Sequence, residues 1–79
     1  MKYPLIVSDI AILSGKPCIK GSRISVQLIL EWIASGASMQ EIAAKYPHIT
    51  IEGIQQAIFY ASDAMKNEII IEVLHSTAA

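Results

Sequence analysis

The sequence lacks the usual means by which a very small protein is stabilised. Its 79 residues include a single cysteine, Cys18, so no disulfide can form within the chain. His48 and His75 are far apart and have no ligand cluster at metal spacing, so we expect no metal and no cofactor. A chain of this length buries only about 60% of its unfolded surface. By elimination, we expect a partner subunit to supply the missing stabilisation.

Charge is also scarce, at 16% of the residues, and six Lys and Arg against seven Asp and Glu leave a net charge of −1. Binding to nucleic acid by electrostatics alone needs an excess of positive charge. The charge balance therefore argues against a protein that binds nucleic acid in this way. Intrinsic disorder is excluded as well, because hydrophobic residues make up 53% of the chain and provide ample surface to bury.

Long hydrophobic runs are missing. The longest early run, residues 5–13, is interrupted by Ser8 and Asp9 and is too short to span a membrane. Lys2 alone would have to serve as the positive region of a signal peptide, and no small-residue cleavage site follows. We therefore expect one soluble, cytoplasmic domain over residues 1–79, with no membrane partner.

The first third of the chain, residues 3–24, predicts short strands separated by turns. Residues 5–7 and 10–13 are runs that favour extended structure. Residues 14–17 and 21–22 have the composition of turns.

Helical periodicity begins at Ser25, and residues 25–66 predict a three-helix core. Ser25 is the expected N-cap of the first helix, and Gly36 the expected residue just past its end. Ser38 has the spacing of a capping box with Glu41, and the second helix, residues 38–45, must end before Pro47.

Thr50 is the expected N-cap of the third helix, with Ile49 and Ile54 in the positions of a hydrophobic staple. We expect this helix to end near Lys66. The density of β-branched residues then favours a C-terminal strand over residues 69–74 and a frayed tail, with continuation of the helix as the alternative.

The order of a short helix (38–45), a short turn (46–50) and a longer helix (51–66) is typical of a helix-turn-helix. On the exposed face of the third helix, Gln55 and Gln56 are candidate base readers. Glu52 and Asp63 would repel phosphates on the same face, so a plain solvated face is the competing interpretation.

Exposed apolar residues are the candidates for a protein interface. Phe59 lies in the middle of the polar face, where it is either an interface anchor or is covered by a terminal strand. Leu28 and Trp32, four residues apart on the first helix, contact either a partner or the N-terminal segment. Ile69 and Ile71 of the predicted C-terminal strand complete this group.

Lys16, Lys20 and Arg23 form the basic cluster of the sequence, in a stretch without acids. They are candidates for phosphate contacts, for pairing with acids on a protein partner, or for a solvated turn. We find no catalytic set, because Cys18 and His48 are far apart with no third group, and we expect no enzymatic activity.

Two runs resemble a known family. Residues 15–26, GKPCIKGSRISV, resemble the signature of the small prokaryotic domain of unknown function 433, in which Gly-Lys-Pro is followed by Gly-Thr-Arg-Ile-Pro-Val. Residues 36–61, GASMQEIAAKYPHITIEGIQQAIFYA, resemble its second motif. The motif positions that carry over are Gly15, Lys16, Pro17, Gly21, Arg23 and Pro47. The chain departs from the pattern at Ser22, Ser25 and Gly53.

The resemblance implies a three-helical, homeodomain-like helix-turn-helix core with short N-terminal strands, and a dimer. Some members resemble VapB-type antitoxins encoded beside a PIN-like ribonuclease toxin. We therefore expect an antitoxin-like protein whose partners are a toxin from an adjacent gene and its own operator DNA. A dimeric protein-interaction module without DNA binding is the alternative.

Overall fold

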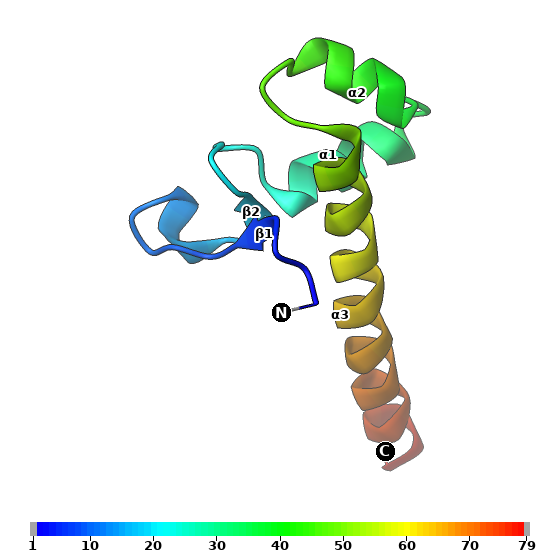
Figure 1. Ribbon diagram of the computed structural model, residues 1–79. Helices are drawn as coiled ribbons and strands as arrows, with labels where there is room; N and C mark the ends of the chain where they lie inside the picture. The colour runs from blue at the N-terminus through cyan, green and yellow to red at the C-terminus, as the bar shows by residue number, and fades with distance from the viewer. Residues whose placement is uncertain (1, 79) are drawn as a thin grey trace.

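The computed structural model describes the backbone of residues 2–78 and the side chains of residues 2–66. The elements in chain order are β1 (Ile6–Val7), a 3-10 turn (Leu13–Gly15), β2 (Cys18–Ile19), α1 (Val26–Ala34), α2 (Met39–Lys45) and α3 (Ile51–Ala78). Both strands and both shorter helices pack against α3 (Figure 1). The predicted class, a three-helix core preceded by short strands, is confirmed.

β1 and β2 form a two-stranded antiparallel sheet in which Ile6 is opposite Ile19. Both side chains are buried and belong to the core. The predicted second extended run, residues 10–13, instead turns the chain back. The Asp9 carboxylate accepts a hydrogen bond from the amide of Ala11 (2.9 Å), and such a contact starts a turn.

The three predicted N-caps are all present. In each, the side-chain oxygen of the cap accepts a hydrogen bond from the amide three residues later, which satisfies a donor that the helix itself leaves free. The pairs are Ser25 with Leu28 (3.0 Å), Ser38 with Glu41 (3.1 Å) and Thr50 with Gly53 (3.1 Å). The capping box is complete, because the Glu41 carboxylate accepts from the Ser38 amide (2.9 Å).

The first helix ends as predicted at Gly36, which has a left-handed φ of +100°. Its amide donates to the carbonyl of Ile33 (3.0 Å), and the amide of Ala37 donates to the carbonyl of Trp32 (3.1 Å). This pair of hydrogen bonds is the Schellman motif. It turns the chain within a few residues, so that α2 can begin at once.

The capping box provides a test of local stabilisation. We expect Ser38→Ala to lower the free energy of unfolding by about 1 kcal/mol, because the amide of Glu41 loses its acceptor. Urea denaturation of the variant measures the loss. Ser62→Ala, a change of the same size at an exposed position inside α3, is the control and should alter stability by less than about 0.5 kcal/mol. Equal effects of the two changes would contradict the role of the cap.

The core lies where α1, α2 and the sheet meet the first turns of α3. Ile29, Ile42 and Ile54, one from each helix, are fully buried. Ile49 and Ile54, the predicted staple pair, are both buried in this cluster.

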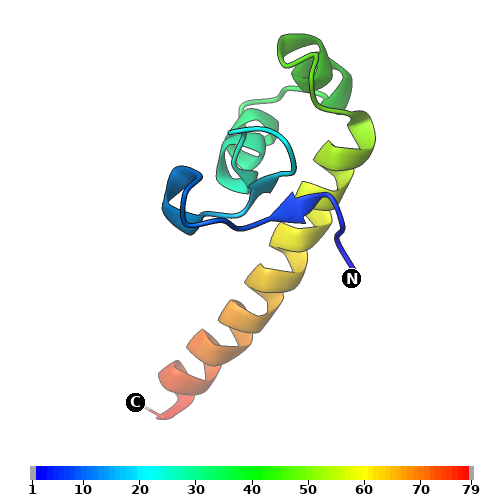
Figure 2. The same cartoon turned by 60° about the vertical axis from the view of Figure 1, so that its left-hand side comes forward.

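The predicted C-terminal strand is wrong. α3 does not end near Lys66 but runs to Ala78, and Figures 1 and 2 show its last turns extending beyond the rest of the chain. Residues 54–79 contain no Gly or Pro, and extending an existing helix adds one hydrogen bond for each residue ordered. A strand would need a partner edge for its hydrogen bonds. The side chains of Ile69 and Ile71 lie outside those that the structure describes.

Within the described residues, no helix is both long enough and apolar enough to cross a membrane.

Candidate functional site

The α2–turn–α3 unit has helix-turn-helix order, with α1 packed against both helices. α2 ends at Lys45, and Tyr46 caps it immediately before Pro47. The amide of Ile49 then donates to the carbonyl of Tyr46 (3.0 Å), which closes the turn into α3. The short helix, short turn and longer helix predicted for this region are therefore confirmed.

Within residues 51–66 of α3, one face is exposed to solvent. Its exposed residues, spaced three or four apart, are Glu52, Gln55, Phe59, Ser62 and Lys66. We call these five residues the free face of α3. Phe59 lies at its centre and is 64% exposed, so no terminal strand covers it. Of the two interpretations of Phe59, cover by a terminal strand is wrong, and the interface anchor stays a prediction.

Gln56 is not available as a base reader in this conformation. Its side-chain carbonyl accepts a hydrogen bond from the backbone amide of Leu5 (2.8 Å), and the side chain is half-buried. Gln55, its neighbour, is exposed. Of the two predicted readers, only Gln55 can therefore meet a ligand without displacing the N-terminal segment.

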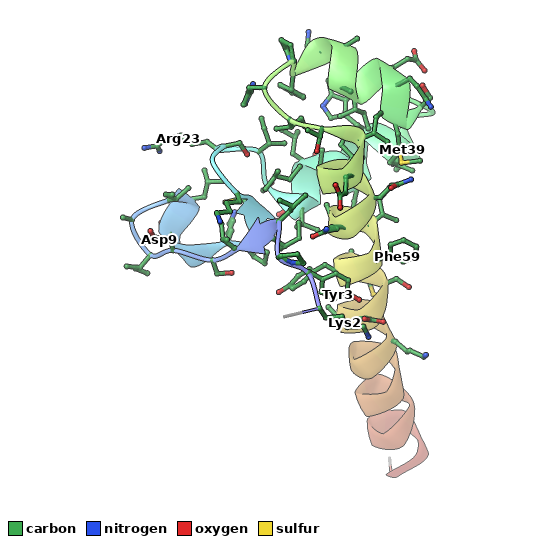
Figure 3. The ribbon with its side chains drawn as sticks, in the orientation of Figure 1. Lys2, Tyr3, Asp9, Arg23, Met39 and Phe59 are labelled. Atoms are coloured by element: carbon green, nitrogen blue, oxygen red, sulfur yellow. The ribbon has the colours of Figure 1, made fainter. Side chains whose placement is uncertain are left out.

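Asp63 is also engaged by the N-terminal segment. The Tyr3 hydroxyl donates to the Asp63 carboxylate, and the Lys2 ammonium lies 3.0 Å from it. The Tyr3 ring also packs edge-on against Tyr60, with centroids 5.8 Å apart. Figure 3 shows Lys2 and Tyr3 beside α3. We call Lys2, Tyr3 and Asp63 the N-terminal clasp. The sequence contains no signal for it, because its partners are about sixty positions apart.

We expect the clasp to respond to pH. The hydrogen bond from Tyr3 and the charge of Lys2 lower the pKa of Asp63 below its ordinary value of 3.8. A carboxyl whose pKa is lowered by folding stabilises the folded state fully above its ordinary value, and this stabilisation is lost as the pH falls through the lowered value. The hydrogen bond to Asp63 likewise raises the pKa of Tyr3 above 10.0, so alkali releases the clasp as the pH rises through that raised value.

We expect acid to release residues 2–5 from α3 while the core stays folded. Amide exchange at Leu5 and the ring resonances of Tyr3 would report the release between neutral pH and pH values below 3.8. In Asp63→Asn the acid-dependent step should disappear. In Asp9→Asn, which changes an acid in the distant hairpin loop, the step should persist. An acid step unchanged in Asp63→Asn would contradict the assignment.

Arg23, one member of the basic cluster, lies away from the free face of α3 (Figure 3). Lys16, Lys20 and Arg23 are all exposed, but they lie in and after the hairpin. In the view of Figure 3, Arg23 and Phe59 lie on opposite sides of the molecule. Arg23 lines an open groove with His48, Ser22, Gly21 and Ile12. Lys20 lies nearer to α3, because its amide donates to the carbonyl of Leu5 (2.8 Å), whose own amide donates to Gln56. That the DNA-binding candidates act together stays a prediction.

Leu28 and Trp32 are half-buried, and the residue that covers Trp32 is Tyr46. The indole Nε1–H of Trp32 donates to the Tyr46 hydroxyl (3.2 Å), and the two rings meet edge-on. Leu28, Trp32 and Tyr46 line a pocket together with Glu31 and Ser35. No local pattern in the sequence predicts that Tyr46 and Glu31 line one pocket, because only the tertiary fold brings α1 and the end of α2 together.

The motif residues build the turn that leads into α1. Ser22 donates its hydroxyl proton to the carbonyl of Ile19 (2.7 Å) and accepts from the amide of Ile24 (3.0 Å). Gly21, just before it, has a φ of +78° that favours glycine. Cys18, between the two glycines of the motif, is fully buried, as expected of a small core residue. In this region the motif has a structural role.

A family model described as "Protein of unknown function (DUF433)" matches residues 6–61. The chain belongs to the DUF433 family. No curated protein and no solved structure matches it. The matched range begins at β1 and ends at Ala61. Among the side chains that the structure describes, Ala61 is the last of α3 that packs against the core. DUF433 thus covers the sheet, α1, α2 and the packed part of α3.

Two departures from the DUF433 pattern have clear structural consequences. Ser25 in place of proline provides the N-cap of α1 through its hydroxyl. Gly53 lets β2 approach α3 closely, since a Cβ at this position would lie 3.2 Å from Cγ2 of Ile19. A side chain at position 53 would make a tight contact with that buried isoleucine, which would have to shift by a few tenths of an ångström.

Proposed function

We propose that this chain is the antitoxin-like component of a type II toxin–antitoxin pair, and that it neutralises a PIN-like ribonuclease toxin by protein–protein contact. The observation that carries the proposal is Phe59, 64% exposed at the centre of the free face of α3. An aromatic residue ringed by polar side chains is typical of an interface anchor. The resemblance of some DUF433 members to VapB-type antitoxins supports the choice of partner.

A homodimer is the form in which we propose that the chain acts. The chain has no disulfide and only a small core, and Ile10 and Met65 add exposed apolar surface to that of Phe59. A partner subunit would bury part of this surface and stabilise the fold. Sedimentation at micromolar concentration tests the dimer, and a monomer there would refute it.

Binding to operator DNA is the second element of the proposal. The helix-turn-helix order of α2 and α3 supports it. A two-fold dimer would place its two copies of α3 at a fixed distance, which two half-sites on the DNA can match. Glu52 on the free face opposes it, because a carboxylate repels phosphate. The alternative is an interaction module that does not bind DNA. A mobility-shift assay with the upstream region at stated salt separates the two, since specific binding that weakens with salt would reject the alternative.

The toxin partner is tested by co-expression with the product of the adjacent gene. We expect a co-purifying complex and relief of growth arrest. Absence of both a complex and a rescue, for every neighbouring gene, would refute the antitoxin role. We propose no enzymatic activity for the chain itself. Detection of substrate turnover that Cys18→Ala abolishes would contradict this view.

A further inference from the structure

The molecule also has a pocket, which lies on a different surface from the free face of α3. Leu28, Glu31, Trp32 and Ser35 of the α1 region and Tyr46 after α2 line a cavity of about 240 Å³ that is open to solvent. It lies between α1 and the end of α2, apart from the free face of α3. None of the five exposed residues of that face lines it.

The aromatic walls of the pocket are held in place. Trp32 and Tyr46 meet at 78° with centroids 6.4 Å apart, and the hydrogen bond from the indole to the Tyr46 hydroxyl fixes their relation. Tyr46 is braced on another side by His48, whose ring meets it edge-on at 6.5 Å. Both aromatic side chains are partly exposed and line the pocket, so part of each ring can contact a ligand. Such faces attract cations, and tryptophan attracts them most.

The charge of the pocket is negative and is not neutralised. Glu31 is exposed and lies in the last turns of α1, which has no basic residue in its final turn. The C-terminal end of a helix is itself negative and favours a cation. Among residues 2–66, the one ion pair joins Lys2 to Asp63, so no cationic side chain of these residues pairs with Glu31. A carboxylate, a helix C-terminus and two aromatic rings therefore converge on one cavity.

We propose that this pocket binds the guanidinium of an arginine side chain presented by a partner protein. A guanidinium stacks on an aromatic ring and donates two parallel hydrogen bonds to a carboxylate, whereas an ammonium is a compact and strongly hydrated charge. Trp32 and Tyr46 would hold the plane of the group, Glu31 would accept its N–H donors, and Leu28 would contact the aliphatic stem. The proposal is independent of the toxin, because the pocket and its chemistry belong to this chain.

Trp32 makes the test direct, because it is the sole tryptophan of the chain. N-acetyl-arginine amide is titrated into the full-length protein while the emission of Trp32 and the NMR resonance of its indole N–H are followed. We expect a saturable change in both. The matched neutral probe, N-acetyl-citrulline amide, has nearly the same shape and should give no saturable change.

Two variants with the same loss of charge complete the test. Glu31→Gln should weaken binding of the arginine probe by about threefold or more, as removal of an exposed charge partner does. Glu52→Gln, an exposed glutamate that does not line the pocket, should leave binding unchanged. Equal responses to arginine and citrulline, or binding that Glu31→Gln does not weaken, would overturn the proposal.

A second copy of this chain could also supply the guanidinium, through its single arginine, Arg23. In that event the Trp32 signals would shift as the protein itself is concentrated, and Arg23→Gln would remove the shift. This result would assign the pocket to self-association and overturn the choice of a foreign partner. If the Trp32 signals do not shift as the protein concentration rises, and the arginine probe binds saturably, the proposal of a foreign partner is supported.

Discussion

Replacing Ile54 by alanine is expected to lower the free energy of unfolding by about 3 kcal/mol, within the range typical of a fully buried isoleucine. Ile54 is fully buried in the first turns of α3, where it packs with Ile29 and Ile42. Truncation removes apolar contacts from all three helices at once and leaves a cavity. For so small a domain, this is a large part of the total stability.

Urea denaturation at one fixed protein concentration measures this loss, since the stability of a dimer depends on concentration. Ile10→Ala is the matched control. It removes the same atoms from a side chain that is 82% exposed, and it should change stability by less than about 0.5 kcal/mol. A loss below about 1 kcal/mol for Ile54→Ala would show that the three helices do not share the core described here.

Replacing Phe59 by serine is expected to weaken binding of the toxin partner by about thirtyfold, which corresponds to the loss of one interface anchor. The folded state should be nearly unaffected, because the ring is largely exposed and outside the core cluster. Calorimetry or surface plasmon resonance with the co-purified partner would measure the affinity. Urea denaturation of the same variant would confirm the unchanged stability.

Ile10→Ser is the control for general loss of surface hydrophobicity. Ile10 is more exposed than Phe59 but lies in the hairpin loop rather than on α3. We expect this variant to retain partner binding. Equal losses in both variants would show that the free face of α3 is not the specific contact, and full binding by Phe59→Ser would reject Phe59 as the anchor.

Local signals in the sequence predict the helix starts well. Ser25, Ser38 and Thr50 each act on an amide three residues away, so the chemistry is complete within one short segment. Gly36 ends α1 for an equally local reason, because glycine adopts positive φ without a steric penalty. The face of α3 that carries Phe59 also follows from helical spacing alone.

The strand predicted over residues 69–74 shows where local composition fails. β-Branched residues favour a strand only where a sheet edge can pair with them. β1 and β2 pair with each other over two residues, whereas continuing α3 adds one hydrogen bond for each residue ordered. The competition between the two structures is decided by context that propensity does not contain.

The sequence by itself determined the three-helix order, the caps, the family and the side of α3 that carries Phe59. Each depends on residues within about one or two helical turns, or on a motif read directly along the chain. Only the tertiary structure decided three contacts. The amide of Leu5 donates to the side chain of Gln56, and Tyr3 and Lys2 bind the carboxylate of Asp63. Tyr46 lines one pocket together with Trp32 and Glu31. These contacts join positions far apart in the chain. They form because the packing of isoleucines on α3 brings their elements together, and no periodicity in the sequence encodes that proximity.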